Sequence, residues 1–181
     1  MASAISHAVA AVAIGEVLKP VQAPPRFWVL GIACAIVPDG DVVGIRLGVP
    51  YGSLLGHRGL THSLAFAAAL SVLVVVAWFR DRRWNGHRRR LFLYFFLAAA
   101  SHGALDALTD GGLGVAFFAP FDRTRYFFPF RPIVVSPLSV RAFFSGWGGA
   151  VLASEMRWIW LPSLLLIVLA IAVRRWPRTS G

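Results

Sequence analysis

The chain has 181 residues, of which 57% are hydrophobic and only 14% are charged. This balance excludes an ordinary soluble domain and favours a membrane protein. The net charge of +10 would suggest a nucleic-acid partner in a soluble protein. Here the arginines crowd into one loop, residues 80–90, and follow the last apolar run. Cationic residues take such places at the cytoplasmic ends of membrane spans, so we expect no nucleic-acid partner.

Apolar runs separated by Pro, Gly or Arg predict the helices of this chain. In order they are residues 3–18, 27–37, about 62–79, about 91–109 and 158–173. A chain of this length holds one domain with four or five spans of roughly 20 residues each. We therefore predict an all-α fold, a single membrane-embedded helical bundle over residues 1–181. The first two helices are short for complete spans.

The first apolar segment is not expected to be a cleaved signal peptide. No Lys or Arg precedes it, so it lacks the cationic region with which a secretory signal begins. We expect this segment to remain in the mature protein.

Residues 110–157 are predicted to be irregular and lid-like, lying between the last two helices. Their sequence mixes aromatic residues, arginines and prolines, and Pro120, Pro129, Pro132 and Pro137 would interrupt a helix. Residues 158–173 then form the last transmembrane helix.

The arginine-rich loop 80–90 fixes the expected orientation. If this loop is cytoplasmic, each helix reverses the direction of the one before it. All His and Asp candidates for a polar site then come out at the noncytoplasmic end of the bundle. We expect a multi-pass protein of the bacterial plasma membrane with its site on that side.

The stretch "SHGALDALTDGG" places His102 and Asp106 on one helical face, with Asp110 one turn further along. An Asp in a membrane helix costs about 2.5–3.5 kcal/mol on an insertion scale, so it normally faces a partner or a cavity. A divalent cation would neutralise such carboxylates. The pair therefore predicts a metal site.

Further imidazoles and carboxylates fall at the same end of the predicted bundle. The predicted ligand set is His7, Asp39, Asp41, His57, His62, His102 and Asp106. These donors suit Zn²⁺ and other first-row divalent ions. Seven donors exceed one tetrahedral shell, so we expect two ions, with Asp106 bridging, or one ion and a separate carboxylate base.

Several of these residues also fit plainer structural roles. His7 alone is equally consistent with a hydrogen-bonded core histidine. The stretch "VPDGD" could be only a tight turn that contains Asp39 and Asp41. Within "HRGLTHS", Thr61 and Ser63 could serve only to begin a helix.

Together, "VPDGD", "HRGLTHS" and "SHGALDALTDGG", in this order after an early His7, resemble the bacterial membrane-bound metal-dependent hydrolase family typified by YdjM. The resemblance covers about residues 1–112. That family is distantly similar to zinc-dependent phospholipase C and P1-type nucleases, whose early histidine, Pro-Asp element and His-x-x-x-Asp pair match His7, Asp39, and His102 with Asp106. Histidine is absent beyond residue 102, so a full three-zinc cluster is not expected.

The resemblance implies a membrane-bound phosphoester hydrolase that acts on a lipid or lipid-linked substrate. Asp39 or Asp41 would accept the proton of the attacking water. The predicted substrate-binding residues are Arg58, Arg123, Arg125 and Asp110, of which Arg58 also counts as catalytic. A metal transporter or metal sensor is the alternative, because intramembrane His and Asp also mark ion pathways. An intramembrane protease is disfavoured because the chain has no H-E-x-x-H motif.

Overall fold

The computed structural model describes residues 1–137, 139–144 and 146–176, and the regular secondary structure of these residues is helical. The α-helices are α1 (Ala4–Leu18), α2 (Pro25–Ile36), α3 (Val42–Arg46), α4 (Leu64–Trp78), α5 (Arg88–Ala107), α6 (Val140–Phe143), α7 (Gly146–Glu155) and α8 (Leu161–Arg175). Shorter helical turns are η1 (Val37–Asp41), η2 (Leu60–His62), η3 (Arg82–His87) and η4 (Met156–Trp160). Two isolated β-bridges occur among the described residues, but no strand. The predicted all-α class is confirmed.

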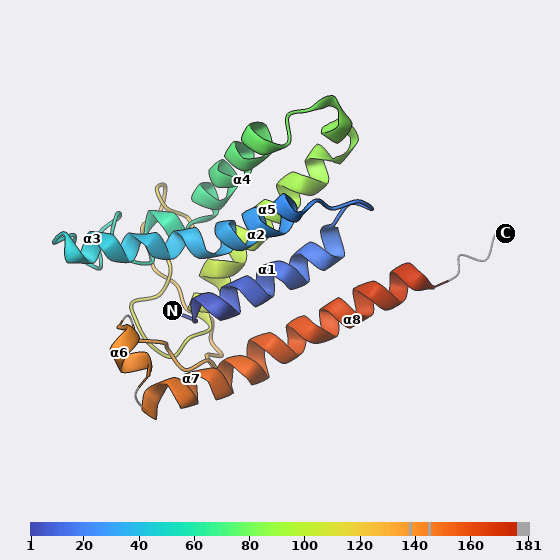
Figure 1. Ribbon diagram of the computed structural model, residues 1–181. Helices are drawn as coiled ribbons and strands as arrows, with labels where there is room; N and C mark the ends of the chain where they lie inside the picture. Colours follow the sequence, from blue (N-terminus) through green and yellow to red (C-terminus); the bar gives the residue numbers. More distant parts are fainter. Residues whose placement is uncertain (138, 145, 177–181) are drawn as a thin grey trace.

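Helix α5 lies at the centre and packs against α1, α2 and α4 (Figure 1). The core around it is aromatic, with the rings of Phe27 and Tyr94 stacked at a centroid distance of 4.1 Å. Gly31 of α2 allows this approach, because a Cβ there would lie only 1.8 Å from the Tyr94 hydroxyl oxygen. The close packing of α2 on α5 brings the segment that follows α2 beside the end of α5.

The motifs "VPDGD" and "HRGLTHS" both contain short 3₁₀ turns that adjoin α-helices. After α2, "VPDGD" forms the 3₁₀ turn η1, and the chain goes on into α3. In "HRGLTHS", Leu60–His62 form η2, and the Ser63 hydroxyl accepts a hydrogen bond from the Phe66 backbone N–H at 3.1 Å. Ser63 is therefore the N-cap of α4, as a helix-starting residue should be.

The last helix begins earlier than the sequence predicts. Helix α7, the π-helical turn η4 and α8 form one helical stretch over residues 146–175, instead of a helix over 158–173. The four prolines that would break a helix all precede residue 138. Pro162, the second residue of α8, directly follows the π-helical turn η4, and such a local change of hydrogen-bond pattern accommodates a proline within a longer helical stretch. The irregular segment between α5 and the last helix accordingly ends before residue 140.

Two helical stretches are long and apolar enough to cross a membrane, Pro25–Arg46 and Gly146–Arg175. Helices α1 and α4 are apolar but shorter. Helix α8 exposes a row of large aliphatic side chains, including Leu165, Val168 and Leu169. Such a surface is expected where a helix faces lipid.

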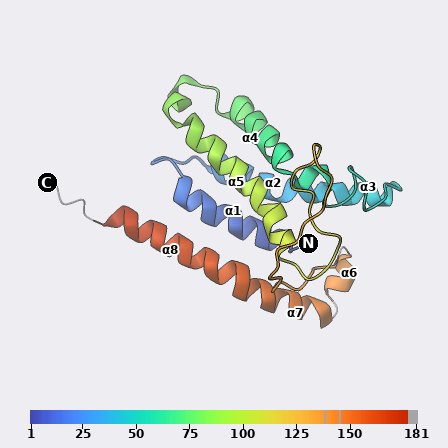
Figure 2. The same ribbon diagram turned by 180° about the vertical axis from the view of Figure 1, so that it is seen from behind.

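The bundle has two chemically different ends (Figures 1 and 2). The N-terminus, α3, α6 and the irregular segment 108–137 lie at one end. The α1–α2 connection, the arginine-rich connection between α4 and α5, and the C-terminal end of α8 lie at the other. The start of α1 and the end of α5 place His7, His102 and Asp106 at the first end.

Candidate metal centre

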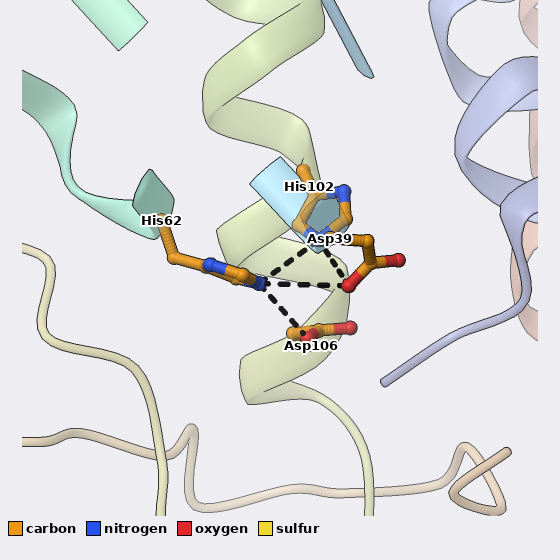
Figure 3. Close-up of side chains that lie close together, drawn as sticks. All are labelled: Asp39, His62, His102 and Asp106. Carbon is orange, nitrogen blue, oxygen red and sulfur yellow. Dashed lines mark hydrogen bonds and ion pairs between the residues drawn. The ribbon is translucent and has the colours of Figure 1, made fainter. Parts of the chain in front are cut away.

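Four side chains from three separate elements meet at the first end of the bundle. Asp39 comes from η1, His62 from η2, and His102 and Asp106 from α5 (Figure 3). One ligand atom of each lies within 4.8 Å of all the others. The two histidines and Asp106 are buried, and Asp39 is nearly so. This group could hold a metal ion.

The distances between donor atoms fit the coordination shell of a small cation. His102 Nε2 lies 3.0 Å from His62 Nε2 and 3.3 Å from Asp39 Oδ1. His62 Nε2 lies 3.6 Å from Asp106 Oδ2 and 3.8 Å from Asp39 Oδ1. With ligands about 2.0–2.1 Å from a tetrahedral Zn²⁺, neighbouring donors would be about 3.3 Å apart. The observed spacings bracket that value.

In each histidine of the cluster, Nε2 faces the other cluster residues, and a contact to Nδ1 fixes the orientation of the ring. His102 Nδ1 donates to the Ala35 carbonyl at 2.6 Å, a bond that leaves the Nε2 lone pair free. His62 Nδ1 lies 3.2 Å from Asp41 Oδ2, and its Nε2 is directed at the other residues of the cluster. Metal-binding histidines are typically held in this way by a carbonyl or a carboxylate.

Asp41 belongs to a hydrogen-bonded network beside the cluster. Its carboxylate accepts bonds from His57 Nδ1 at 2.7 Å, the Thr61 hydroxyl at 2.6 Å and the Arg58 backbone N–H at 3.2 Å. Asp41, His57 and His62 also form a second group whose geometry could hold a metal ion. The short Asp41–His57 contact is a hydrogen-bond distance, however, and it places both residues behind His62.

Asp39 and His7 contain the polar atoms that most need a ligand. Both carboxylate oxygens of Asp39 and both ring nitrogens of His7 are buried without a hydrogen-bond partner. The His7 ring stacks on His102 at a centroid distance of 3.7 Å, and its Nε2 lies 3.6 Å from Asp106 Oδ1. Unpaired buried groups of this kind are costly, and a bound cation would satisfy them. The residues present therefore fit a divalent metal.

A protonated His62 balances part of the negative charge of the carboxylates around it. Burial by itself lowers the pKa of His62, but hydrogen bonds and charges from Asp106 and Asp41 outweigh it and raise the pKa to about 9. The imidazole is then protonated between two carboxylates. A metal ion would have to displace this proton, which couples metal binding to pH.

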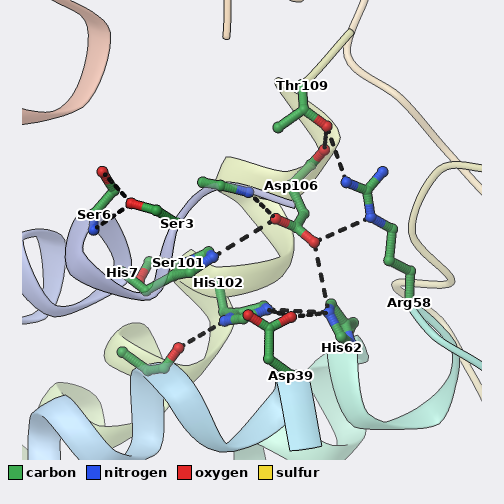
Figure 4. A network of polar contacts seen from close by, with 12 residues as sticks. Ser3, Ser6, His7, Asp39, Arg58, His62, Ser101, His102, Asp106 and Thr109 are labelled. Atoms are coloured by element: carbon green, nitrogen blue, oxygen red, sulfur yellow. Dashed lines mark hydrogen bonds and ion pairs between the residues drawn. The ribbon is translucent and has the colours of Figure 1, made fainter. Parts of the chain in front are cut away.

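Arg58 is the buried counterion of Asp106 (Figure 4). It adopts the left-handed backbone conformation, with φ of 62°, and is fully buried. Its Nε donates to Asp106 Oδ2 at 3.1 Å, and its terminal nitrogens donate to Thr109 Oγ1 and the Gly111 carbonyl at 3.0 and 2.8 Å. The side chain thus holds Asp106 in place and faces protein on all sides.

The other predicted substrate-binding residues lie away from the four-residue cluster. Arg125 donates to the carbonyls of Tyr51, Ser53 and His57, so it ties the irregular segment to the loop before η2. Asp110 accepts a bond from the Val135 backbone N–H at 2.8 Å. Arg123 is exposed.

Sequence reasoning missed a second polar network that supports the cluster. Glu155, fully buried in α7, accepts hydrogen bonds from the Ser3 backbone N–H at 2.5 Å, the Ser3 hydroxyl at 2.6 Å and the Ser6 hydroxyl at 2.8 Å. The neighbouring Ala2 N–H donates to Asp106 Oδ1 at 2.8 Å. The one available signal was an acidic residue, Glu155, beside the last apolar run.

Comparisons with known proteins agree with the membrane character of the chain. The model of the family described as YdjM inner membrane protein matches residues 1–179. The chain is 39% identical over 168 residues to Inner membrane protein YbcI of Escherichia coli (strain K12), an alignment that covers 92% of this chain and 95% of that protein. No solved structure matches, and neither similarity supports the distant relation to phospholipase C and P1 nuclease. A family match over nearly the whole length identifies this chain as a membrane protein of the YdjM inner membrane protein family.

Proposed function

We propose that this protein is a metal-dependent hydrolase that cleaves a phosphoester bond in a lipid or lipid-linked substrate at the noncytoplasmic membrane face. The observation that supports it is the buried group of Asp39, His62, His102 and Asp106, whose possible ligand atoms converge on one point. Within this group, both carboxylate oxygens of Asp39 lack a hydrogen-bond partner. A structural hydrogen-bond network would not leave two buried carboxylate oxygens without a donor.

The donor set of two imidazoles and two carboxylates suits Zn²⁺ best. One or two ions fit: His7 and Asp106 Oδ1 stand beside the four-residue cluster and offer donors for a second. When bound, a divalent cation would polarise the phosphoryl oxygen and lower the pKa of water.

The residues of the chain take different parts in this reaction. Asp39 would be the base through Oδ2, which has no hydrogen-bond donor, while its Oδ1 faces the nitrogens of His62 and His102. Asp41 and Asp106 each accept several hydrogen bonds. Asp41 keeps His62 in its tautomer, and Arg58 keeps Asp106 in position. This assigns Arg58 a positioning role in place of the direct substrate contact expected from the sequence.

The lipid substrate class is supported by exposed aromatic side chains on the irregular segment. Phe118, Phe121, Phe128 and Phe130 are all exposed at the end of the bundle that carries the cluster. They offer an apolar surface to acyl or isoprenoid chains. The exposed Arg123, on the same segment, is available to a phosphate group.

The orientation is supported by the distribution of arginines. The loop 80–90 and the end of α8 lie opposite the cluster. Under the positive-inside rule, the arginine-rich end is cytoplasmic, and the cluster is noncytoplasmic.

Metal analysis of the purified protein and a panel of phosphoester and phospholipid substrates test the proposal. We expect bound divalent metal and hydrolysis that Asp106→Asn abolishes, while Asp122→Asn, a partly exposed Asp of the irregular segment, keeps both. Purified protein that contains no divalent metal, or a His102→Ala variant that keeps full activity, would refute the proposed hydrolase activity. Asp106-dependent metal uptake into proteoliposomes would favour a transporter instead.

A further inference from the structure

A cavity of about 650 Å³ lies at the arginine-rich end of the bundle, opposite the metal cluster. We infer that it binds the headgroup of an anionic phospholipid. The inference is independent of the proposed hydrolase activity. Its cationic lining residues are Lys19 after α1, Arg90 in the first turn of α5, and Arg174 and Arg175 at the end of α8.

The cavity contains one carboxylate, Glu16, which is already paired. Its Oε1 lies 2.5 Å from Lys19 Nζ and 3.3 Å from Arg174 Nη1. Arg174 also donates to the backbone carbonyls of Glu16 and Val17. These bonds fix the end of α8 on the end of α1, so the wall that they form has a defined shape.

The remaining two arginines of the cavity lack a carboxylate partner. Among residues 1–137, 139–144 and 146–176, no Asp or Glu pairs with Arg90 or Arg175. They come from helices α5 and α8 and face the same cavity. The lining therefore carries four cationic groups against one carboxylate, and an anion between Arg90 and Arg175 would offset the excess charge.

The rest of the lining is apolar. Val17, Val21 and Ile171 complete it, and Val21 is 99% exposed. Trp176, which follows α8, is also exposed, as expected of a residue at the membrane–water interface. A small hydrophilic anion would make no favourable contact with these apolar side chains. A glycerophospholipid has both a phosphate for the arginines and an acyl chain for the valines.

Size and position agree with this ligand. Ligand pockets typically measure about 300–1,000 Å³, and the cavity falls within that range. It lies at the end of Gly146–Arg175, the longer of the two stretches able to span a membrane. Basic pockets between helices at the cytoplasmic side are typical places for anionic headgroups.

Two double variants that remove equal charge from the same end of the molecule test the inference. Arg90→Gln with Arg175→Gln alters the cavity. Arg80→Gln with Arg82→Gln alters the connection between α4 and α5 at two arginines that do not line this cavity. Binding of phosphatidylglycerol to the purified full-length protein is measured by titration in phosphatidylcholine nanodiscs of graded phosphatidylglycerol content, with native mass spectrometry to count bound lipid.

We expect the cavity variant to bind phosphatidylglycerol roughly thirtyfold more weakly, about fivefold for each removed cation, and the loop variant to bind almost as the parent does. Equal losses in both variants, or no loss in the cavity variant, would overturn the inference. Inorganic phosphate is titrated separately. If inorganic phosphate binds as tightly as phosphatidylglycerol, the inference that the ligand is a lipid would be wrong. The single variant Arg175→Gln, at the exposed end of α8, replaces the cavity variant if the double substitution does not fold.

Discussion

The Asp106 carboxylate joins segments that are distant in sequence. Its Oδ1 accepts from the Ala2 N–H, and its Oδ2 accepts from Arg58 Nε while lying 3.6 Å from His62 Nε2. A fully buried carboxylate is strongly disfavoured without such partners. Arg58 therefore carries much of the compensation whenever no metal is bound.

Removing the Arg58 guanidinium should destabilise the metal-free protein severely. Arg58→Gln removes the guanidinium partner of the buried Asp106 carboxylate, and loss of one partner of a buried pair costs about 3–5 kcal/mol. The measurement is unfolding of chelator-treated protein in detergent micelles. Arg123→Gln, an exposed arginine of the irregular segment, should stay within about 0.5 kcal/mol of the parent. Equal effects of the two substitutions would contradict the pairing.

At the scale of elements, α7 is attached to the start of α1 by one buried side chain. Glu155 binds Ser3 and Ser6, and Trp160 of η4 donates from its indole Nε1 to Ser6 Oγ at 2.8 Å. The same N-terminal segment supplies the Ala2 N–H to Asp106. The last helix thus supports the four-residue cluster without contributing a side chain to it.

Glu155→Ala should loosen this attachment. Hydrogen bonds to charged groups contribute about 1.5–3 kcal/mol each, so we expect a loss of at least about 3 kcal/mol of stability. Hydrogen exchange should show increased opening of α1 near Ser3. The neighbouring Met156→Ala, at an exposed position, serves as control. A Glu155→Ala protein as stable as this control would refute the attachment.

For the whole molecule, the four-residue cluster closes one end of the bundle. It joins η1, η2 and α5, and the α1–α2 and α4–α5 connections lie at the other end of the bundle. Any ion that binds the folded state alone stabilises the fold, by about 2.7 kcal/mol at a free concentration one hundred times its Kd. Stability should therefore report metal binding even where the substrate is unknown.

Chelation should lower the unfolding temperature of the parent protein, and added Zn²⁺ should restore it. The shift should vanish in His102→Ala and persist in His87→Ala, whose exposed histidine lies in the loop between α4 and α5. Thermal unfolding with and without chelator provides the measurement. An unfolding temperature that does not respond to metal in the parent would argue against the cluster as a metal centre.

The helices and the central polar pair could be predicted because their signals are local. Apolar runs ended by Pro, Gly or Arg predicted α1, α4 and α5 to within a few residues. The i, i+4 spacing of His102 and Asp106 put both on one face without knowledge of any neighbour. The early start of the last helix was missed, because residues 146–157 carry a weaker apolar pattern than 158–173.

Sequence by itself thus determined the helical class, the apolar surface and the types of donor available for a metal, since composition and short-range spacing set all three. Only the tertiary structure decided how those donors are used. It placed Asp39 beside His62 and His102, put Asp41 and His57 behind His62, and buried Arg58 against Asp106. These outcomes depend on which distant segments meet at the end of α5. That is fixed by close packing of whole helices, such as α2 on Tyr94 at Gly31, and no local pattern encodes it.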